Sequence, residues 1–172
     1  MSARDIQVIK NPGEVMTWQV DDRDTSGYAN AFEPGEPIQV FATGSPYCST
    51  LINGGPIRGS DEYLGVVSKQ STETATANGL VEYVSMIVGT ELRGKATTST
   101  NVNTAAKILA MQGDWVGIDN TAEVFTFDEN ETSDPNKLAF QIMRGDYIAF
   151  TLDVLVNIAN CQMGGWVGQT ID

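Results

Sequence analysis

Histidine is absent from this 172-residue chain. Without an imidazole, the chain forms neither a Ser-His-Asp nor a Cys-His catalytic arrangement, and it cannot bind zinc through histidine. It also lacks the side chain that most often changes its charge near neutral pH. These classes of catalytic site, metal site and pH switch are therefore excluded.

Cysteine is almost as scarce, with Cys48 and Cys161 alone. Two thiols cannot complete a four-cysteine zinc site, and their separation in the sequence matches no CxxC redox motif. One disulfide between them stays open, but two cysteines in a chain of this length are not typical of a disulfide scaffold. The sequence favours two buried thiols.

Basic residues and long apolar runs are also few. The chain has 10 Lys and Arg against 22 Asp and Glu, a formal net charge of −12. Binding to nucleic acid requires clustered Lys and Arg, so we expect no nucleic-acid partner. The longest strongly apolar stretch, around residues 147–156, is shorter than the roughly 20 residues of a membrane helix. We expect no membrane partner and, because no apolar signal segment is visible, synthesis in the cytoplasm without export.

The residues that are present follow the pattern of a β protein. Short apolar or alternating runs recur about every ten residues, with Gly and Asn between them, which predicts an all-β domain, a small β-barrel or sandwich. The domain is expected over residues 36–157, with strands at 38–41, 63–68, 80–88, 115–119, 124–128, 138–143 and 147–156. One short helix is predicted at residues 103–111, capped by Asn101 or Asn103.

Residues 147–156 form the clearest of these predicted strands. Their alternation places one set of apolar side chains on the core face, namely Ile148, Phe150, Leu152, Val154 and Val156. The other set is expected to face outward, namely Ala149, Thr151, Asp153 and Leu155. The preceding Arg144-Gly145-Asp146 is expected to be a turn.

The two ends of the chain differ from this domain. Residues 1–35 are rich in acidic residues and contain Pro12 and Pro34, with short extended patches at residues 6–9 and 15–20. They predict an extended N-terminal arm that contributes little to the core. Residues 158–172 are rich in glycine and predict an extended C-terminal tail.

Candidate chemical sites are weak. Residues 128–134, DENETSD, place oxygen ligands at alternating positions as a calcium loop does, but they lack the central Gly and terminal Glu of an EF-hand. A solvated turn is favoured there and at residues 21–24. Gly54-Gly55-Pro56 and Gly164-Gly165 are not followed by Lys-Ser/Thr and predict turns. We therefore predict no metal, no cofactor and no enzymatic activity.

Four segments of the predicted domain follow one another in an order similar to that of known proteins. They are GEPIQV, DEYLGVVSKQSTETATANGLVEYV, KATTSTNVNTAAKILAMQGDWVGID and DENETSDPNKLAFQIMRGDYIAFTLDVLVN. In their order and residue pattern they resemble the capsid decoration, or cement, proteins of tailed bacteriophages. The resemblance implies a compact β-rich module, often a trimer, that is made in the host cytoplasm and binds the outer surface of the virion head. Its partner would be the major capsid protein, whose neighbouring subunits it locks together.

The composition is compatible with that role. A protein on the outside of a head need not touch packaged DNA, so a net charge of −12 is acceptable there. Protein interfaces are enriched in aromatic residues and Met. The candidate interface residues, all in the predicted arm and tail, are Met16, Trp18, Met163 and Trp166.

Two other classes of function remain open. A phage tail-tube or head-completion subunit is also β-rich at this size, and an anionic tube lumen would use the acidic excess. A carbohydrate-binding module would need exposed aromatic rings in one plane, for which Trp18, Trp115 and Trp166 are the candidates. Packing is the favoured role of these three residues, because they lie in distant segments.

Overall fold

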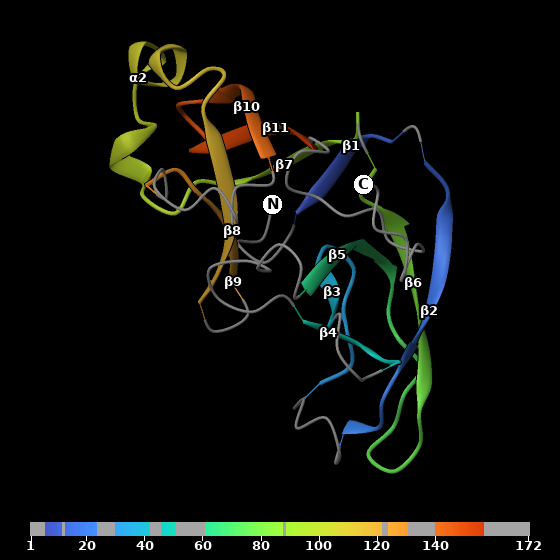
Figure 1. Ribbon diagram of the computed structural model, residues 1–172. Helices are drawn as coiled ribbons and strands as arrows, with labels where there is room; N and C mark the ends of the chain where they lie inside the picture. The colour runs from blue at the N-terminus through green and yellow to red at the C-terminus, as the bar shows by residue number, and fades with distance from the viewer. Residues whose placement is uncertain are drawn as a thin grey trace.

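Two antiparallel β-sheets make up most of the structure, a computed structural model of the chain (Figure 1). It describes residues 6–11, 13–23, 30–41, 46–50, 61–87, 89–121, 124–130 and 140–156. Over these residues there is one short α-helix and one turn of 3-10 helix. The predicted all-β class with a single short helix is confirmed.

The larger sheet, called the large sheet below, curls on itself. In spatial order its strands are β1 (Gln7–Lys10), β7 (Glu91–Lys95), β11 (Thr151–Val156), β10 (Phe140–Asp146), β8 (Trp115–Thr121) and β9 (Val124–Asp128). A parallel bridge between Ala96 and Phe127 brings β9 back to the end of β7. The strands predicted at residues 115–119 and 124–128 are confirmed as β8 and β9, which pair antiparallel.

The second sheet, called the small sheet, is also curved. Its strands, in spatial order, are β2 (Val15–Val20), β6 (Gly79–Ser85), β5 (Asp61–Lys69), β3 (Pro37–Phe41) and β4 (Cys48–Thr50). Trp18 on β2 donates from Nε1 to the Pro46 carbonyl oxygen, just before β4, at 2.9 Å. Asn78 donates to the Tyr47 hydroxyl at 2.8 Å. These contacts draw the two edges of the sheet toward each other.

The described buried apolar side chains form two clusters. The first lies against the large sheet and includes Val66 and Met86 from the region of the small sheet, so the two sheets share it. The second lies on one face of the small sheet and comprises Val20, Phe32, Ile38, Cys48, Val67, Val81 and Tyr83. Close packing restricts one position beside the first cluster: a Cβ on Gly94 would lie 2.8 Å from Ile6 Cδ1 and 2.9 Å from Phe127 Cε2.

The helix α2 (Ala105–Ala110) lies in the connection from β7 to β8, after the 3-10 turn η1 (Ser99–Asn101) (Figure 1). Its N-cap is Thr104, whose hydroxyl accepts from the Lys107 amide, and not Asn101 or Asn103 as predicted. Ile108 is its buried residue. That side chain anchors the helix beside β10, since a Cβ on Gly145 would lie 3.2 Å from Ile108 Cδ1.

Strands β1 and β2 correct the expectation of an N-terminal arm outside the core. β1 pairs with β7 in the large sheet, and β2 pairs with β6 in the small sheet. Ile6, Val20 and Phe32 from this segment are at most 4% exposed. The acidic residues that suggested an arm belong largely to the connections between these strands. The predicted C-terminal tail, residues 158–172, lies outside the described residues.

The β10–β11 hairpin corrects two further expectations. Arg144-Gly145-Asp146 is the end of strand β10, and the turn is formed by residues 147–150, where a strand was predicted. Phe150 is therefore 38% exposed instead of buried, and Ile148 is 75% exposed. The local cause is the Asp146 carboxylate, which accepts from the amides of Ile148 and Ala149 and folds the chain back.

The second half of that predicted strand, β11, is partly as expected. Leu152, Val154 and Val156 lie in the core. Thr151 and Asp153 are on the opposite face, as predicted, but they are also buried, at 5% and 2% exposed. The expectation that Asp153 is solvated is wrong, because two arginine side chains from neighbouring strands cover it.

Candidate functional site

A row of polar side chains crosses four strands on the outer face of the large sheet. In register, Gln7 on β1 lies opposite Arg93 on β7, and Arg93 lies opposite Asp153 on β11. A β-bulge in β10 then places Arg144, in the position that regular pairing would give to Met143, opposite Asp153. Because successive side chains of a strand point to opposite faces, the neighbouring Leu92 and Val154 point into the core. The side chains of the row point to the other face.

Asp153 is the centre of this row. Arg93 donates from Nε to Oδ1 at 2.6 Å and from Nη2 to Oδ2 at 2.8 Å, a two-point ion pair. Arg144 adds a third bond from Nε to Oδ2 at 2.7 Å. The Asp153 side chain is 3% exposed, whereas those of Arg93 and Arg144 are 43% and 53% exposed. A buried carboxylate thus ties β7, β11 and β10 together, with both cations at the surface.

The electrostatics of the row follow from this geometry. Burial by itself raises the pKa of Asp153, but the hydrogen bonds from Arg93 and Arg144 outweigh burial and lower it below its usual value. The same hydrogen bond to Asp153 raises the pKa of Arg93. Asp153 and Arg93 are therefore both charged at neutral pH.

The row continues at its rim. Glu91 on β7 lies 3.7 Å from Arg144 Nη2 and 3.6 Å from Lys10 Nζ, measured from its two carboxylate oxygens. Lys10 has an exposed side chain, and surface pairs of this kind contribute little to stability. These outer ion pairs therefore affect the local charge more than the stability of strand pairing.

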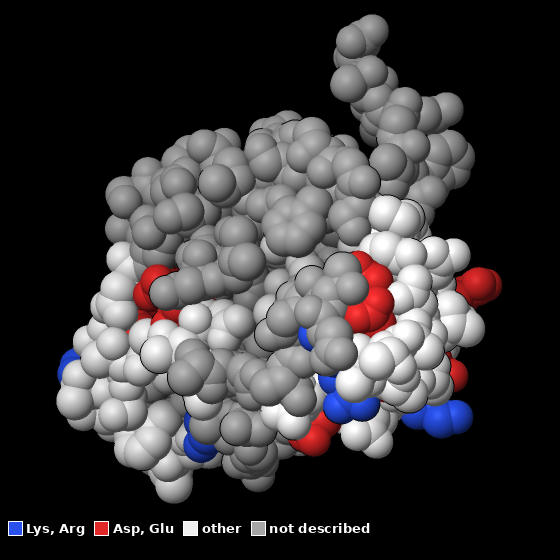
Figure 2. Space-filling model, turned by 90° about the horizontal axis from the view of Figure 1, so that it is seen from below, with Lys and Arg blue, Asp and Glu red and all other residues white. Residues whose placement is uncertain are grey.

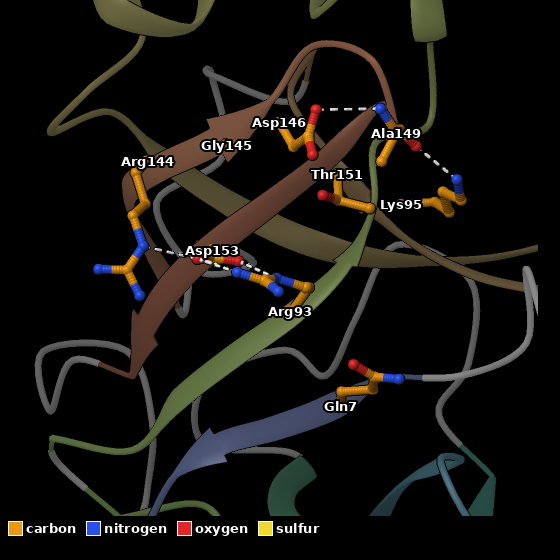
Figure 3. A pocket seen from close by; sticks show the side chains of 9 residues that line it. All are labelled: Gln7, Arg93, Lys95, Arg144, Gly145, Asp146, Ala149, Thr151 and Asp153. Atoms are coloured by element: carbon orange, nitrogen blue, oxygen red, sulfur yellow. Dashed lines mark hydrogen bonds and ion pairs between the residues drawn. The ribbon is translucent and has the colours of Figure 1, made fainter. Parts of the chain in front are cut away.

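A shallow depression of about 380 Å³ lies over this row (Figure 3). Its lining comprises Gln7, Arg93, Lys95, Arg144, Gly145, Asp146, Ala149, Thr151 and Asp153. Three of the lining side chains are basic and two are acidic, although acids outnumber bases 22 to 10 in the whole chain. The depression is thus a local concentration of cations on an acidic protein.

The β10–β11 turn forms one wall of the depression. Asp146 Oδ1 accepts from the Ile148 amide at 2.8 Å and from the Ala149 amide at 3.1 Å. These two backbone hydrogen bonds are the main reason that the pKa of Asp146 is lowered. From the other side, Lys95 Nζ donates to the Ala149 carbonyl oxygen, so β7 also holds the turn (Figure 3).

The chemistry that this arrangement supports is binding of an anionic group. Each guanidinium has five N–H donors in a planar fork, more than the internal bonds of Arg93 and Arg144 use, and this fork matches a carboxylate or phosphate. Asp153 and Asp146 already accept hydrogen bonds within the sheet and its turn, which makes them poor general bases. Over the described part of the chain, no group of three or more His, Cys, Asp or Glu is placed to hold a metal ion.

Of the four predicted interface residues, two lie among the described residues and two lie outside them. Met16 and Trp18 lie on β2, where Met16 is 36% exposed and accepts from the Tyr83 hydroxyl through sulfur at 3.8 Å. Trp18 is half-buried against the second cluster. Met163 and Trp166 lie outside the described residues. An interface role for these four residues stays a prediction.

The described part of the candidate calcium loop, residues 128–130, has an internal role, and the expectation of a solvated turn is wrong at Glu129. Glu129 is buried, and its carboxylate accepts from the amides of Thr97 and Thr98 at 3.0 and 2.9 Å. It also accepts from the Asn101 side-chain amide at 3.2 Å. Glu129 thus holds the turn that leads into η1. Residues 131–134 of that loop lie outside the described residues.

Cys48 is a free, buried thiol on β4. Burial raises its pKa to about 12, with a smaller contribution from the nearby Glu73 carboxylate. A thiol with so high a pKa is almost entirely protonated at neutral pH and is a poor nucleophile. Cys161, its possible disulfide partner, lies outside the described residues.

Sequence reasoning missed the row around Asp153. A signal was present, because Glu91, Arg93 and Lys95 alternate along one short strand and mark a charged outer face. Asp153 also interrupts an apolar run, which points to a paired carboxylate. Nothing in the sequence alone shows that these residues lie on neighbouring strands.

Charges over the rest of the described surface are mixed. Figure 2 shows one face on which acidic and basic side chains are interspersed, without a continuous basic patch over the described atoms.

Within the described residues, no helix has the length and apolar character needed to cross a bilayer. No family model matches the sequence, and no curated protein matches it significantly.

Proposed function

We propose that this chain is a non-enzymatic structural protein of a tailed-phage particle, a decoration protein that binds the outer head and stabilises contacts between major capsid subunits. The proposal takes its class from the resemblance of residues 36–157. It takes its physical support from the way the protein uses its charged side chains.

The observation that carries the proposal is the engagement of Asp153 by Arg93 and Arg144. Through these bonds Arg93 and Arg144 hold strands β7, β11 and β10 in register. Such an arrangement suits a rigid scaffold that presents binding surfaces. It leaves no described carboxylate of the depression in the unpaired state that a general base requires.

A reconstitution experiment tests the proposal. The protein is stripped from purified particles, and the heads are heated with and without the protein added back. A ligand that binds the assembled shell stabilises it by mass action, so re-addition should raise the temperature at which heads rupture. An unchanged rupture temperature, or finding the protein in tails alone, would overturn the proposal. A sixfold arrangement in tails would favour the tail-tube alternative.

A further inference from the structure

The β10–β11 turn presents an unusual concentration of exposed apolar surface. Tyr147, Ile148 and Phe150 are 45%, 75% and 38% exposed, within four consecutive residues. The other large apolar side chains that are exposed in the described residues are distributed over β1, β2, β6 and α2. Single exposed apolar residues are ordinary, but a cluster of them marks an interaction surface.

Several hydrogen bonds hold the backbone of this turn. Besides the two amides bonded to Asp146 Oδ1, the Ala96 amide donates to the Phe150 carbonyl oxygen at 3.0 Å. Phe150 has φ of 55°, in the left-handed region that bulky L-residues rarely adopt. Such a conformation persists only where surrounding contacts hold it, and it occurs often at functional sites. The apolar side chains are therefore displayed by a rigid support.

The apolar turn and the basic depression are continuous. Ala149 belongs to the turn and also lines the depression, together with Arg93, Lys95 and Arg144 (Figure 3). The surface thus combines an exposed apolar turn with a depression that two guanidinium groups line, and aromatic residues and Arg are enriched at the energetic centres of protein interfaces. The charge of this surface is opposite to the net charge of the chain, so it favours an acidic partner.

We propose that residues 147–150 and the depression beside them form one docking surface for a protein partner that presents carboxylates next to apolar side chains. The inference rests on the proposed function, in which that partner is the shell of the head. A protein is favoured over DNA, because a chain with a net charge of −12 repels the nucleic-acid backbone.

The test compares Ile148→Ser with Leu80→Ser. Both side chains are more than half exposed, but Leu80 lies on β6 of the small sheet. Thermal unfolding of both variants establishes that they fold. Binding to stripped heads is then measured by co-sedimentation. We expect Ile148→Ser to weaken binding by about tenfold or more, and Leu80→Ser to leave it within about twofold of the wild type.

The charged half of the surface is tested by Lys95→Gln, which retains a donor for the Ala149 carbonyl oxygen and removes a charge. Binding of Lys95→Gln should depend less steeply on salt concentration than binding of the wild type. An equal salt dependence would overturn the assignment of an acidic partner.

The outcomes separate the two proposals. Equal binding by Ile148→Ser and Leu80→Ser, with wild-type binding intact, would overturn the docking surface and leave the proposed function standing. Absence of wild-type binding to heads would overturn both. Binding that depends on Ile148 but is found with a short DNA duplex, with phosphatidylglycerol vesicles or with a second copy of this chain, and not with heads, would overturn the proposed partner.

Discussion

The two sheets differ in how some of their buried polar side chains are paired. In the large sheet, the carboxylate of Asp153 receives three hydrogen bonds from two arginines. In the small sheet and its flanking loop, Gln39 and Glu73 are buried at 0% and 4% exposed. Neither side chain, nor the buried Ser49 hydroxyl, has a hydrogen-bond partner within the described part of the chain.

This difference indicates what each sheet contributes. A buried polar group without a partner costs about 1–3 kcal/mol, and an unpaired charge costs more. A fully paired one fixes geometry, since a slip of one residue in β11 would turn Asp153 into the apolar core. The large sheet is thus the precise support for the surface around the β10–β11 turn. The small sheet contains polar groups whose replacement should improve stability.

The largest expected effect is that of Arg93→Met, which removes the two-point partner of a buried carboxylate. We expect it to lower the free energy of unfolding by about 2–4 kcal/mol. The loss should be smaller than when a buried charge loses its only partner, because Arg144 still bonds Asp153. Urea unfolding measures the change. Lys10→Met is the matched control, and this exposed partner of Glu91 should change stability by less than about 1 kcal/mol. Equal effects would break the contrast between the buried and exposed pairs.

Acid should remove the same stabilisation. The folded pKa of Asp153 is lowered, and an unfolded aspartate has a pKa of about 3.9. The carboxylate therefore stabilises the fold fully above that pH, and its contribution is lost as the pH falls through the lower, folded pKa. Urea unfolding of the wild type and Asp153→Asn should give a stability difference that shrinks below about pH 4. A difference that stays constant into acid would show that Asp153 is not the group responsible.

Much of the fold was predictable, because alternation of apolar residues reports a strand wherever one face is buried. The β8–β9 hairpin and the core positions Leu152, Val154 and Val156 follow from that pattern. Residues 147–150 continue the same alternation and still form a turn. There the local hydrogen bonds of Asp146 decide the backbone, and a pattern of apolar spacing contains no information about them.

The candidate site was less predictable, because it depends on contacts between distant residues. Arg93 and Asp153 are 60 positions apart. Their contact requires that β7 and β11 be neighbours, and the contact of Arg144 requires the bulge in β10. A sequence shows which strands carry charges, but strand order and bulge position arise from packing of the whole domain.

A smaller effect of opposite sign is expected in the small sheet. Gln39→Met keeps the approximate volume of the side chain and removes an amide whose nitrogen and oxygen are both buried without partners among the described residues. We expect the free energy of unfolding to rise by up to about 1–2 kcal/mol. Gln141→Met is the control, because Gln141 donates to the Gly113 carbonyl oxygen and should gain nothing. A loss of stability in Gln39→Met would mean that the amide is paired, and the contrast between the sheets would fail.

The smallest effect concerns the strained residue that the large sheet supports. Phe150→Gly and Phe150→Ala remove the same aromatic ring, so their difference isolates the backbone. At φ of 55° glycine is free of the Cβ clash, and we expect Phe150→Gly to be the more stable by about 1 kcal/mol. Tyr147 lies in the same turn without a positive φ. At Tyr147 the order of stability should reverse, so we expect Tyr147→Ala to be more stable than Tyr147→Gly by about 0.5–1 kcal/mol. Urea unfolding of the four variants gives both differences, and a Phe150→Ala variant as stable as Phe150→Gly, or more stable, would show that the large sheet imposes no strain on Phe150.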